Sequence, residues 1–244
     1  MKILGDWNDI GQAVNSLKQA GLPLHPDPPK CWDLENVREF LERYAPNRSG
    51  RIIDLGCGPS AHGCAALELM RSMGYLDLLG IDLHVPLYAR LATAIRGLVK
   101  HGSLVPYKVS SGDITGTRLP SSSFAGAVAV SVVEHGVDLR AFFKEASRLL
   151  KAGGALYLST DYWPVPMHTA GLEASTGPRG GEALRWRIFD PPGIQELIGV
   201  ARDEGLVVQE PLADLSFPGE RGPVFWNGMF YTFLCAVFRK RELP

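Results

Sequence analysis

Short apolar runs alternate with helical patterns along most of the chain. Runs typical of buried strands lie at residues 51–55, 78–83, 104–110, 126–133 and 155–160. Between them, apolar residues recur at helical spacing in residues 61–72, 87–99 and 139–150. In the second of these helices, one face carries Leu87, Leu91, Ile95 and Leu98. The alternation predicts an α/β fold built on a doubly wound, mostly parallel sheet.

The segments on either side of this alternation have a different character. Residues 1–34 start with a short helical pattern and continue into a proline-rich stretch, which predicts an N-terminal arm outside the core. Asp33 is then expected as the N-cap of a helix. Residues 161–190 hold several prolines and glycines with little periodicity, as in long insertions that are functional or disordered.

The end of the chain returns to regular structure. A helix is expected at residues 194–204, a strand at 206–210 and a final strand at 229–238. No internal repeat or linker divides the chain, so residues 1–244 are expected to form one domain. With 244 residues and 45% hydrophobic content, one α/β domain can bury a full core.

Charge and cysteine content narrow the function classes. A net charge of −1 without a basic run argues against tight, sequence-blind binding of nucleic acid. No C-x-x-C pair is present, so we expect free thiols rather than a zinc site or a redox dithiol. The N-terminal residues do not resemble a signal peptide, and no apolar run approaches the roughly 20 residues of a membrane span. We therefore expect a soluble, cytoplasmic protein without a membrane partner.

The sequence from Arg51 to Ser60 joins a strand to a turn rich in glycine. An aliphatic run ends in Asp54, and Gly56 and Gly58 follow before small residues that can start a helix. This arrangement cradles a nucleotide-like cofactor at a helix N-terminus. The third glycine of the dinucleotide fingerprint is absent, which counts against a dehydrogenase without excluding one.

Three further features follow at the ends of the next strands. Asp82 ends the second strand, where an acid can accept hydrogen bonds from both hydroxyls of a ribose. Asp113 follows the third strand, where a carboxylate can accept from the amine of adenine while Ile114 packs on the ring. The fourth strand runs into a Glu134-His135 pair.

Taken in order, these motifs resemble the class I S-adenosylmethionine-dependent methyltransferases of the broad small-molecule type. The resemblance covers roughly residues 51–160 and includes the stop signal at residues 148–154. It departs from the family at Ser60, where a glycine is common, and at Ala125, where an acid is usual. It implies S-adenosyl-L-methionine as cofactor and a Rossmann-like, seven-stranded sheet whose last strand is antiparallel. The cofactor-binding residues that it implies are Asp54, Gly56, Cys57, Gly58, Asp82, Leu83, Gly112, Asp113, Ile114 and Ser131.

Methyl transfer is an in-line displacement, so the protein mainly has to align the reactants. A hydroxyl acceptor must also lose its proton, and a side chain of suitable pKa speeds that step. The candidates for this base are His135, Asp161 and His168. Each also has a simpler interpretation. His135 can merely line the cofactor, Asp161 can be a loop carboxylate, and His168 can be an exposed loop histidine. No third ligand accompanies the Glu134-His135 pair, so no metal site is expected.

These observations predict a methyltransferase for a small molecule, most plausibly by O-methylation of a sugar or secondary metabolite. Aromatic residues between 163 and 231 either line the acceptor pocket or form plain core, and Lys30 and Trp32 are candidates to close over the cofactor. The fourth strand lacks the Asn/Asp-Pro-Pro-aromatic pattern of base methylation, so no nucleic-acid acceptor is expected. Two alternatives stay open: a nicotinamide-dependent oxidoreductase and a non-catalytic cofactor-binding protein. The oligomeric state is open too, with a homodimer as one candidate.

Overall fold

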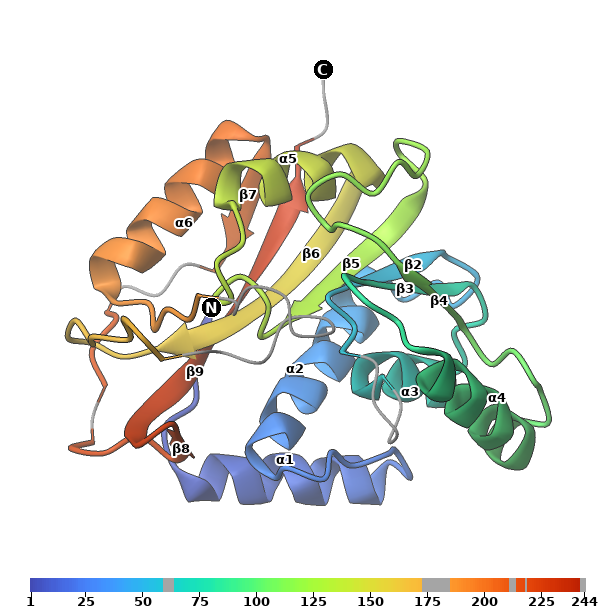
Figure 1. Cartoon of the computed structure of the whole chain (residues 1–244), viewed down its shortest axis with the longest axis horizontal. Coiled ribbons are helices and arrows are strands. Elements are labelled where there is room, and N and C mark those ends of the chain that lie inside the picture. Colours follow the sequence, from blue (N-terminus) through green and yellow to red (C-terminus); the bar gives the residue numbers. More distant parts are fainter. Residues whose placement is uncertain (59–63, 173–184, 211–213, 218, 242–244) are drawn as a thin grey trace.

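A mixed sheet runs through the centre of the computed structural model, which describes residues 1–58, 64–172, 185–210, 214–217 and 219–241 (Figure 1). Its main strands, in spatial order, are β4 (Lys108–Ser111), β3 (Leu78–Asp82), β2 (Ile52–Leu55), β5 (Phe124–Val130), β6 (Leu150–Tyr162), β9 (Met229–Lys240) and β7 (Leu206–Gln209). The first five pair in parallel, whereas β9 is antiparallel to both of its neighbours. The predicted doubly wound, seven-stranded sheet with an antiparallel last strand is thus confirmed.

Two short strands extend this sheet along β9. The strand β1 (Lys2–Ile3) pairs with Leu234 and Cys235, so it continues the edge that β7 occupies further along. The strand β8 (Val224–Trp226) forms a hairpin with the start of β9. Asn227 and Gly228 connect the two strands with φ of 46° and 78°. Two consecutive positive φ values match the turn that suits the twist of a hairpin.

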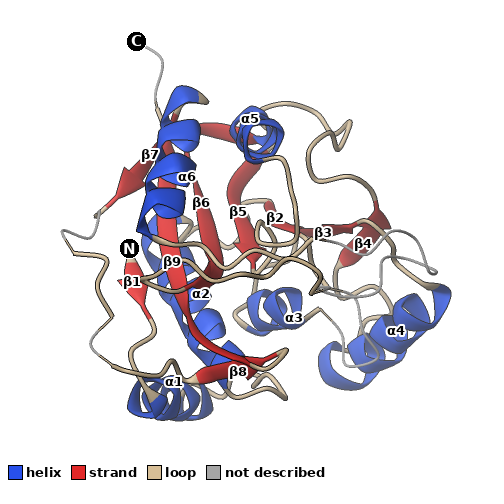
Figure 2. Cartoon of the chain, turned by 60° about the vertical axis from the view of Figure 1, so that its left-hand side comes forward, coloured by secondary structure: helices blue, strands red, loops and turns tan. Residues whose placement is uncertain are grey.

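Helices cover both faces of the sheet (Figure 2). One face carries α1 (Trp7–Gln19), α2 (Pro29–Tyr44) and α3 (Ala65–Ser72), and the other carries α5 (Leu139–Leu149) and α6 (Pro191–Asp203). Alternation along β6 supplies both cores, because Tyr157 packs with the first set of helices while Leu156 and Leu158 pack with the second. The described helices include none long and apolar enough to cross a membrane.

The N-terminal segment differs from its predicted form in two ways. Leu4, Ile10 and Leu17 are buried in the core beside α2, so the expectation of an arm outside the core is wrong. The helix α2 starts at Pro29, where proline suits the first turn because no intrahelical N–H is needed. Asp33 therefore lies inside the first turns of α2, fully buried, and is not the N-cap.

The strand β6 is longer at both ends than its pattern predicted. It begins at Leu150, directly after α5, so residues 151–154 form strand instead of a helix-ending turn. It continues to Tyr162, which places Asp161 inside the ladder opposite Phe233. The irregular segment thus begins after Tyr162, and residues 173–184 lie outside the described part. The boundaries of the single domain and of the insertion stay predictions.

The helix α4 (Leu87–His101) forms where it was expected but faces the other way. Its large apolar residues point to solvent, and its buried positions are the small residues Ala89, Thr93 and Gly97. No described residue of α4 belongs to the hydrophobic core on either face of the sheet. Both views show it at the margin of the molecule, next to the β4 edge (Figures 1 and 2).

Candidate cofactor and acceptor site

The loops after β2, β3 and β4 are tied together at the carboxyl edge of the sheet. The backbone N–H groups of Gly56 and Cys57 donate to the carbonyl of Ile81, over 2.8 and 3.1 Å. The N–H of Gly112 donates to the carbonyl of Asp82 over 2.8 Å. In doubly wound folds, ligands bind in the crevice outside this edge. The predicted cofactor residues from three strands therefore meet where such a ligand binds.

The two glycines of the first turn have different reasons to be glycine. Gly56 has φ of 83°, and a Cβ there would lie 2.5 Å from Cγ2 of Val132, which follows β5. Gly58 has φ of 55°, but a Cβ there would meet nothing within 4 Å. Its N–H donates to Oδ2 of Asp82 over 2.9 Å. Gly56 thus allows close approach of two strand ends, whereas Gly58 turns the chain and orients an acid.

Two acids at this edge suit the polar groups of S-adenosylmethionine. Burial raises the pKa of Asp54 to about 8, and the neighbouring Asp82 adds to that shift. A bound cation would return Asp54 to its charged form, because an opposite charge lowers the pKa of a carboxyl group. Asp82 is only half-buried and can accept further hydrogen bonds from ribose hydroxyls.

The remaining predicted cofactor residues lie around the same edge. Asp113 accepts at Oδ1 from the N–H and the hydroxyl of Thr115, which closes a turn at the end of β4. Ile114 is buried against the core of the second face, and Leu83 is exposed. Cys57 is buried, and its contact with Cys64 together with burial raises the pKa of its thiol. All four cysteines are free and buried.

A second group of side chains gathers beside this edge, at the ends of β5 and β6 and under α2. We call it the acid cluster, and its members are Lys30, Asp33, Glu134, His135 and Asp161. Lys30 donates to the hydroxyl of Ser131, and its Nζ lies 3.5 Å from Oδ2 of Asp33. The same ammonium sits 3.8 Å from the ring centroid of Phe233. Lys30 thereby links α2 to the end of β5.

The acids of the cluster are held in low-dielectric surroundings. Glu134 is fully buried and accepts from the hydroxyl of Thr160 over 3.1 Å, and Asp161 accepts from the indole of Trp186 over 2.7 Å. Burial raises the pKa of Glu134 to about 7 and that of Asp161 to about 7, against the opposing charge of Lys30. Burial also raises the pKa of Asp33. Burial therefore brings the pKa values of Glu134 and Asp161 close to neutral pH.

Some polar atoms of the acid cluster have no hydrogen-bond partner among the described residues. They include Oε1 of Glu134, Oδ2 of Asp33 and Nδ1 of His135. Leaving a buried polar atom unpaired costs about 1–3 kcal/mol, so each such atom calls for an explanation. A bound acceptor molecule would supply the missing partners. No three of the described His, Cys, Asp and Glu side chains are placed to share a metal ion.

The three predicted base candidates have different surroundings. His135 is half-buried, and burial lowers its pKa although the nearby Asp161 acts in the opposite direction. Asp161 is buried in the same cluster. His168 is exposed, and within the described residues no hydrogen bond or ion pair joins it to His135 or Asp161. The structure thus brings two of the three candidates together.

The sequence analysis did not single out Asp33 and Glu134 as cluster members. Asp33 was expected as a helix cap, and Glu134 was noted as part of the motif after the fourth strand and weighed as a metal ligand. Lys30 was considered for closing over the cofactor together with Trp32, but Trp32 is buried in the core. The spacing of Lys30 and Asp33, one helical turn apart, indicates that they share a face. It does not indicate that this face meets β5 and β6.

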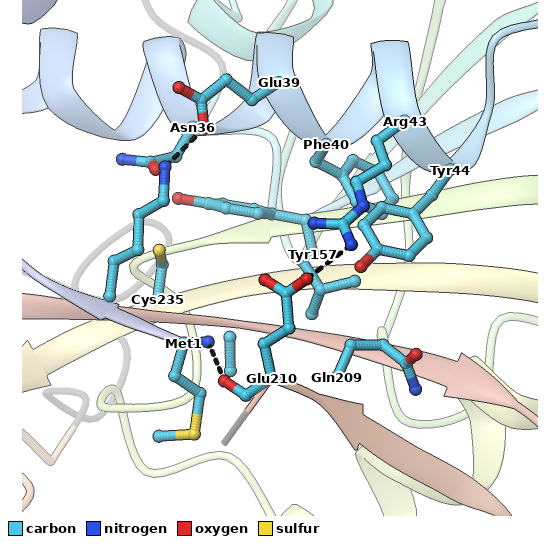
Figure 3. A pocket seen from close by; sticks show the side chains of 13 residues that line it. Met1, Asn36, Glu39, Phe40, Arg43, Tyr44, Tyr157, Gln209, Glu210 and Cys235 are labelled. Carbon is cyan, nitrogen blue, oxygen red and sulfur yellow. Dashed lines mark hydrogen bonds and ion pairs between the residues drawn. The ribbon is translucent and has the colours of Figure 1, made fainter. Parts of the chain in front are cut away.

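A separate cavity of about 160 Å³ lies on the other side of Tyr157, between α2 and the β1 and β7 edge (Figure 3). An ion pair of 2.5 Å between Arg43 and Glu210 spans it, and the amino group of Met1 donates to the carbonyl of Glu210. The hydroxyl of Tyr157 donates to Asp33 over 3.4 Å. The cavity therefore borders the acid cluster but contains none of the predicted site residues.

Comparison with known proteins agrees with this geometry. Residues 53–158 match the family model described as a methyltransferase domain. The chain is 29% identical over 142 residues to a ubiquinone biosynthesis O-methyltransferase of Xanthomonas oryzae pv. oryzae, across 54% of this chain and 56% of that protein. Residues 53–158 thus match a methyltransferase domain, which agrees with the resemblance to the class I S-adenosylmethionine-dependent methyltransferases. Their cofactor is S-adenosylmethionine, and these findings favour a methyltransferase over the nicotinamide-dependent alternative.

Solved structures share the methyltransferase fold at low identity. A Haemonchus contortus phosphoethanolamine N-methyltransferase 2 bound to S-adenosyl-L-methionine aligns with a TM-score of 0.57 and 15% identity, over 85% of this chain and 52% of that one. The [4+2]-cyclase SpnF aligns with a TM-score of 0.58 and 16% identity, over 97% and 94%. The neighbours therefore establish the fold of this chain and do not identify its reaction.

Gly56→Ala should destabilise the protein by about 2–4 kcal/mol, because the new Cβ adds a clash with Val132 to the strain of a positive φ. Gly58→Ala is the matched control, and should cost only about 1 kcal/mol for its backbone conformation. Urea unfolding without ligand measures both. Adding Val132→Ala to Gly56→Ala should recover part of the loss. Equal losses for the two glycines would contradict the close-approach argument.

Glu134→Gln should change how stability depends on pH. The folded state holds the proton of Glu134 from its usual pKa of 4.5 up to about 7, so wild-type stability falls as pH rises through that window. The variant has no such proton to lose. At a pH above the window, its free energy of unfolding should therefore rise by up to about 3 kcal/mol relative to wild type. Urea unfolding on both sides of the window tests this, with the exposed Glu39→Gln as control. Parallel pH curves for Glu134→Gln and wild type would refute the shift.

Proposed function

We propose that the chain transfers a methyl group from S-adenosylmethionine to a hydroxyl of a small molecule, with His135 as the proton acceptor. The acid cluster beside the cofactor edge carries this proposal. Its buried, unpartnered atoms need a polar ligand, and its titrating groups can take up a proton near neutral pH. The oxygen acceptor is supported by the name of the Xanthomonas relative, of whose length the chain spans 56%.

The carboxyl edge supplies the cofactor-binding residues in this proposal. Asp82 accepts from the ribose hydroxyls, and the N–H of Gly58 fixes the orientation of its carboxylate. Asp113 accepts from the adenine amine, with Ile114 and Leu83 beside the ring. Asp54 stands at the end of β2, where its buried carboxylate favours a cationic group. Gly56, Cys57, Gly112 and Ser131 contribute backbone that lets the ligand approach closely.

S-adenosylmethionine supplies a methyl group on a positively charged sulfur. The protein has to hold the acceptor hydroxyl in line with that group, and such alignment is worth roughly 7–11 kcal/mol. Glu134 has a buried carboxylate oxygen, Oε1, with no hydrogen-bond partner among the described residues, and this oxygen can accept from a further hydroxyl of the acceptor. Trp186 and Tyr231, packed edge to face with centroids 5.6 Å apart, form an apolar wall near Asp161.

His135 is the best-placed base because burial keeps it neutral and one ring nitrogen is unpartnered. After it accepts a proton, the nearby carboxylate of Asp161 stabilises the imidazolium. Asp161 is itself less available as a base, since the indole of Trp186 occupies one of its oxygens. The exposed His168 is placed third. The acceptor class, a sugar or secondary metabolite, rests on these hydrogen-bonding carboxylates and the aromatic wall.

The second candidate function is cofactor binding without methyl transfer. The solved neighbour named a [4+2]-cyclase shows that this fold is not restricted to proteins named as methyltransferases. A direct test incubates the protein with S-adenosylmethionine and a panel of sugars, phenols and other hydroxyl compounds. Mass spectrometry should find one acceptor that gains a methyl group while S-adenosylhomocysteine forms. Tight cofactor binding with no product from the whole panel would favour the second candidate.

Asp82→Ala should weaken S-adenosylmethionine binding by about 1.5–3 kcal/mol, because the ribose loses hydrogen bonds to a charged group. Asp77→Ala is the control, since Asp77 precedes the same strand at its other end and pairs with Arg51 at the surface. Isothermal calorimetry measures both affinities. Equal affinities for Asp82→Ala and the control would remove Asp82 from the cofactor site.

His135→Ala should lower kcat by about 10²–10⁴-fold on the acceptor found in the panel, because a positioned base is lost. The affinity for S-adenosylmethionine should stay near that of wild type. Asp161→Asn should have a smaller effect on kcat, since it removes only the charge that stabilises the imidazolium. If His168→Ala slowed the reaction and His135→Ala did not, the base would be His168.

A further inference from the structure

One face of α4 exposes a continuous set of large apolar side chains, which we call the α4 surface. Its members on the helix are Leu87, Tyr88, Leu91, Ile95, Leu98 and Val99, and the loop that follows adds Leu104 and Val105. Each of them is more than half exposed. Scattered exposed apolar residues are normal, but a contiguous set on one helix face marks an interaction site.

This face points outward because the opposite side of α4 packs against the protein. The positions that face the protein are Ala89, Thr93 and Gly97, four residues apart on one side of the helix. A Cβ at Gly97 would lie 2.4 Å from Cδ of Pro106, so only glycine allows this approach. Arg96 binds Glu68 of α3 at 3.1 Å and fixes the helix from a further direction. The large side chains are therefore left for solvent or a partner.

The charge around the α4 surface is of one sign. Residues 83–112 contain no Asp or Glu and hold Arg90, Arg96, Lys100 and Lys108, in a chain whose net charge is −1. Of these four, Arg90, Lys100 and Lys108 are exposed. An apolar helix face in a segment that also exposes basic residues and carries no acid is typical of helices that lie in the interface of a bilayer with anionic lipids.

We propose that the α4 surface docks the protein onto membranes that contain anionic phospholipids. The apolar side chains enter the headgroup region, and the exposed basic residues pair with lipid phosphates. A second copy of the chain fits this surface less well. A two-fold interface brings the same residues of both copies together, so it would oppose basic residues without an acid in this segment to pair with them. The proposal concerns a peripheral contact and does not depend on the methyl acceptor.

Co-sedimentation with vesicles tests the docking. The full-length protein should bind vesicles of phosphatidylcholine mixed with phosphatidylglycerol and bind much more weakly to phosphatidylcholine alone, and added salt should weaken the binding. Leu91→Glu combined with Ile95→Glu should lower the partition coefficient at least about tenfold, because the apolar contact is lost. Arg90→Gln combined with Lys100→Gln should lower it roughly twentyfold on the anionic vesicles only.

Matched controls separate docking from misfolding. Trp7→Glu places the same acid at an exposed apolar position of α1, which both views show away from α4 (Figures 1 and 2). Lys151→Gln removes an exposed basic residue at the start of β6. Both should bind vesicles like wild type, and all variants should keep the wild-type melting temperature and S-adenosylmethionine affinity.

Three results would overturn the proposal. Wild-type protein that binds neither kind of vesicle would show that the α4 surface does not dock on lipid. Binding that the α4 variants leave unchanged would place the lipid contact elsewhere. A dimer in sedimentation velocity that the Leu91→Glu and Ile95→Glu pair dissociates would show that the surface joins two copies of the chain. Because S-adenosylmethionine affinity is measured in parallel, none of these results bears on the proposed methyl transfer.

Discussion

The ammonium of Lys30, enclosed by buried carboxyl groups, is the interaction on which the site depends. It is held by Ser131 after β5 and lies beside Asp33 of its own helix. Burial raises the pKa values of Glu134 and Asp161 to about 7, and one cation among three buried acids is too little to offset it. The same shortage that makes these acids costly to ionise makes them able to exchange protons near neutral pH.

That arrangement requires the N-terminal helices to be part of the core. Lys30 and Asp33 reach the ends of β5 and β6 only because α2 packs on the sheet, with Tyr157 of β6 donating to Asp33. The helix α1 covers α2 in turn and buries Leu17. The residues that precede the glycine turn thus complete the site, although the family model matches only residues 53–158.

Local patterns predicted most of the fold and the cofactor edge, but not the acid cluster or the direction of α4. The glycine turn, Asp82 and Asp113 could be found because each belongs to one loop with its own spacing. Asp33 was misassigned because a cap and a buried helical acid look alike until the helix start is known. In α4, the sequence indicated one apolar face but not where that face points, and the contact at Gly97 turns the opposite side inward.

The outward apolar face of α4 and the buried acids have one thing in common: both place side chains in unfavourable surroundings. In the acid cluster, carboxyl groups are buried away from solvent, and on α4, leucine and isoleucine side chains are exposed to it. Both placements cost free energy in the protein alone. Costs of this kind persist where a ligand or surface removes them. In our proposals, a polar acceptor does this for the acid cluster, and a membrane with anionic lipids does it for α4. The acid cluster and the α4 surface lie on different elements, so a ligand can bind at either one without the other.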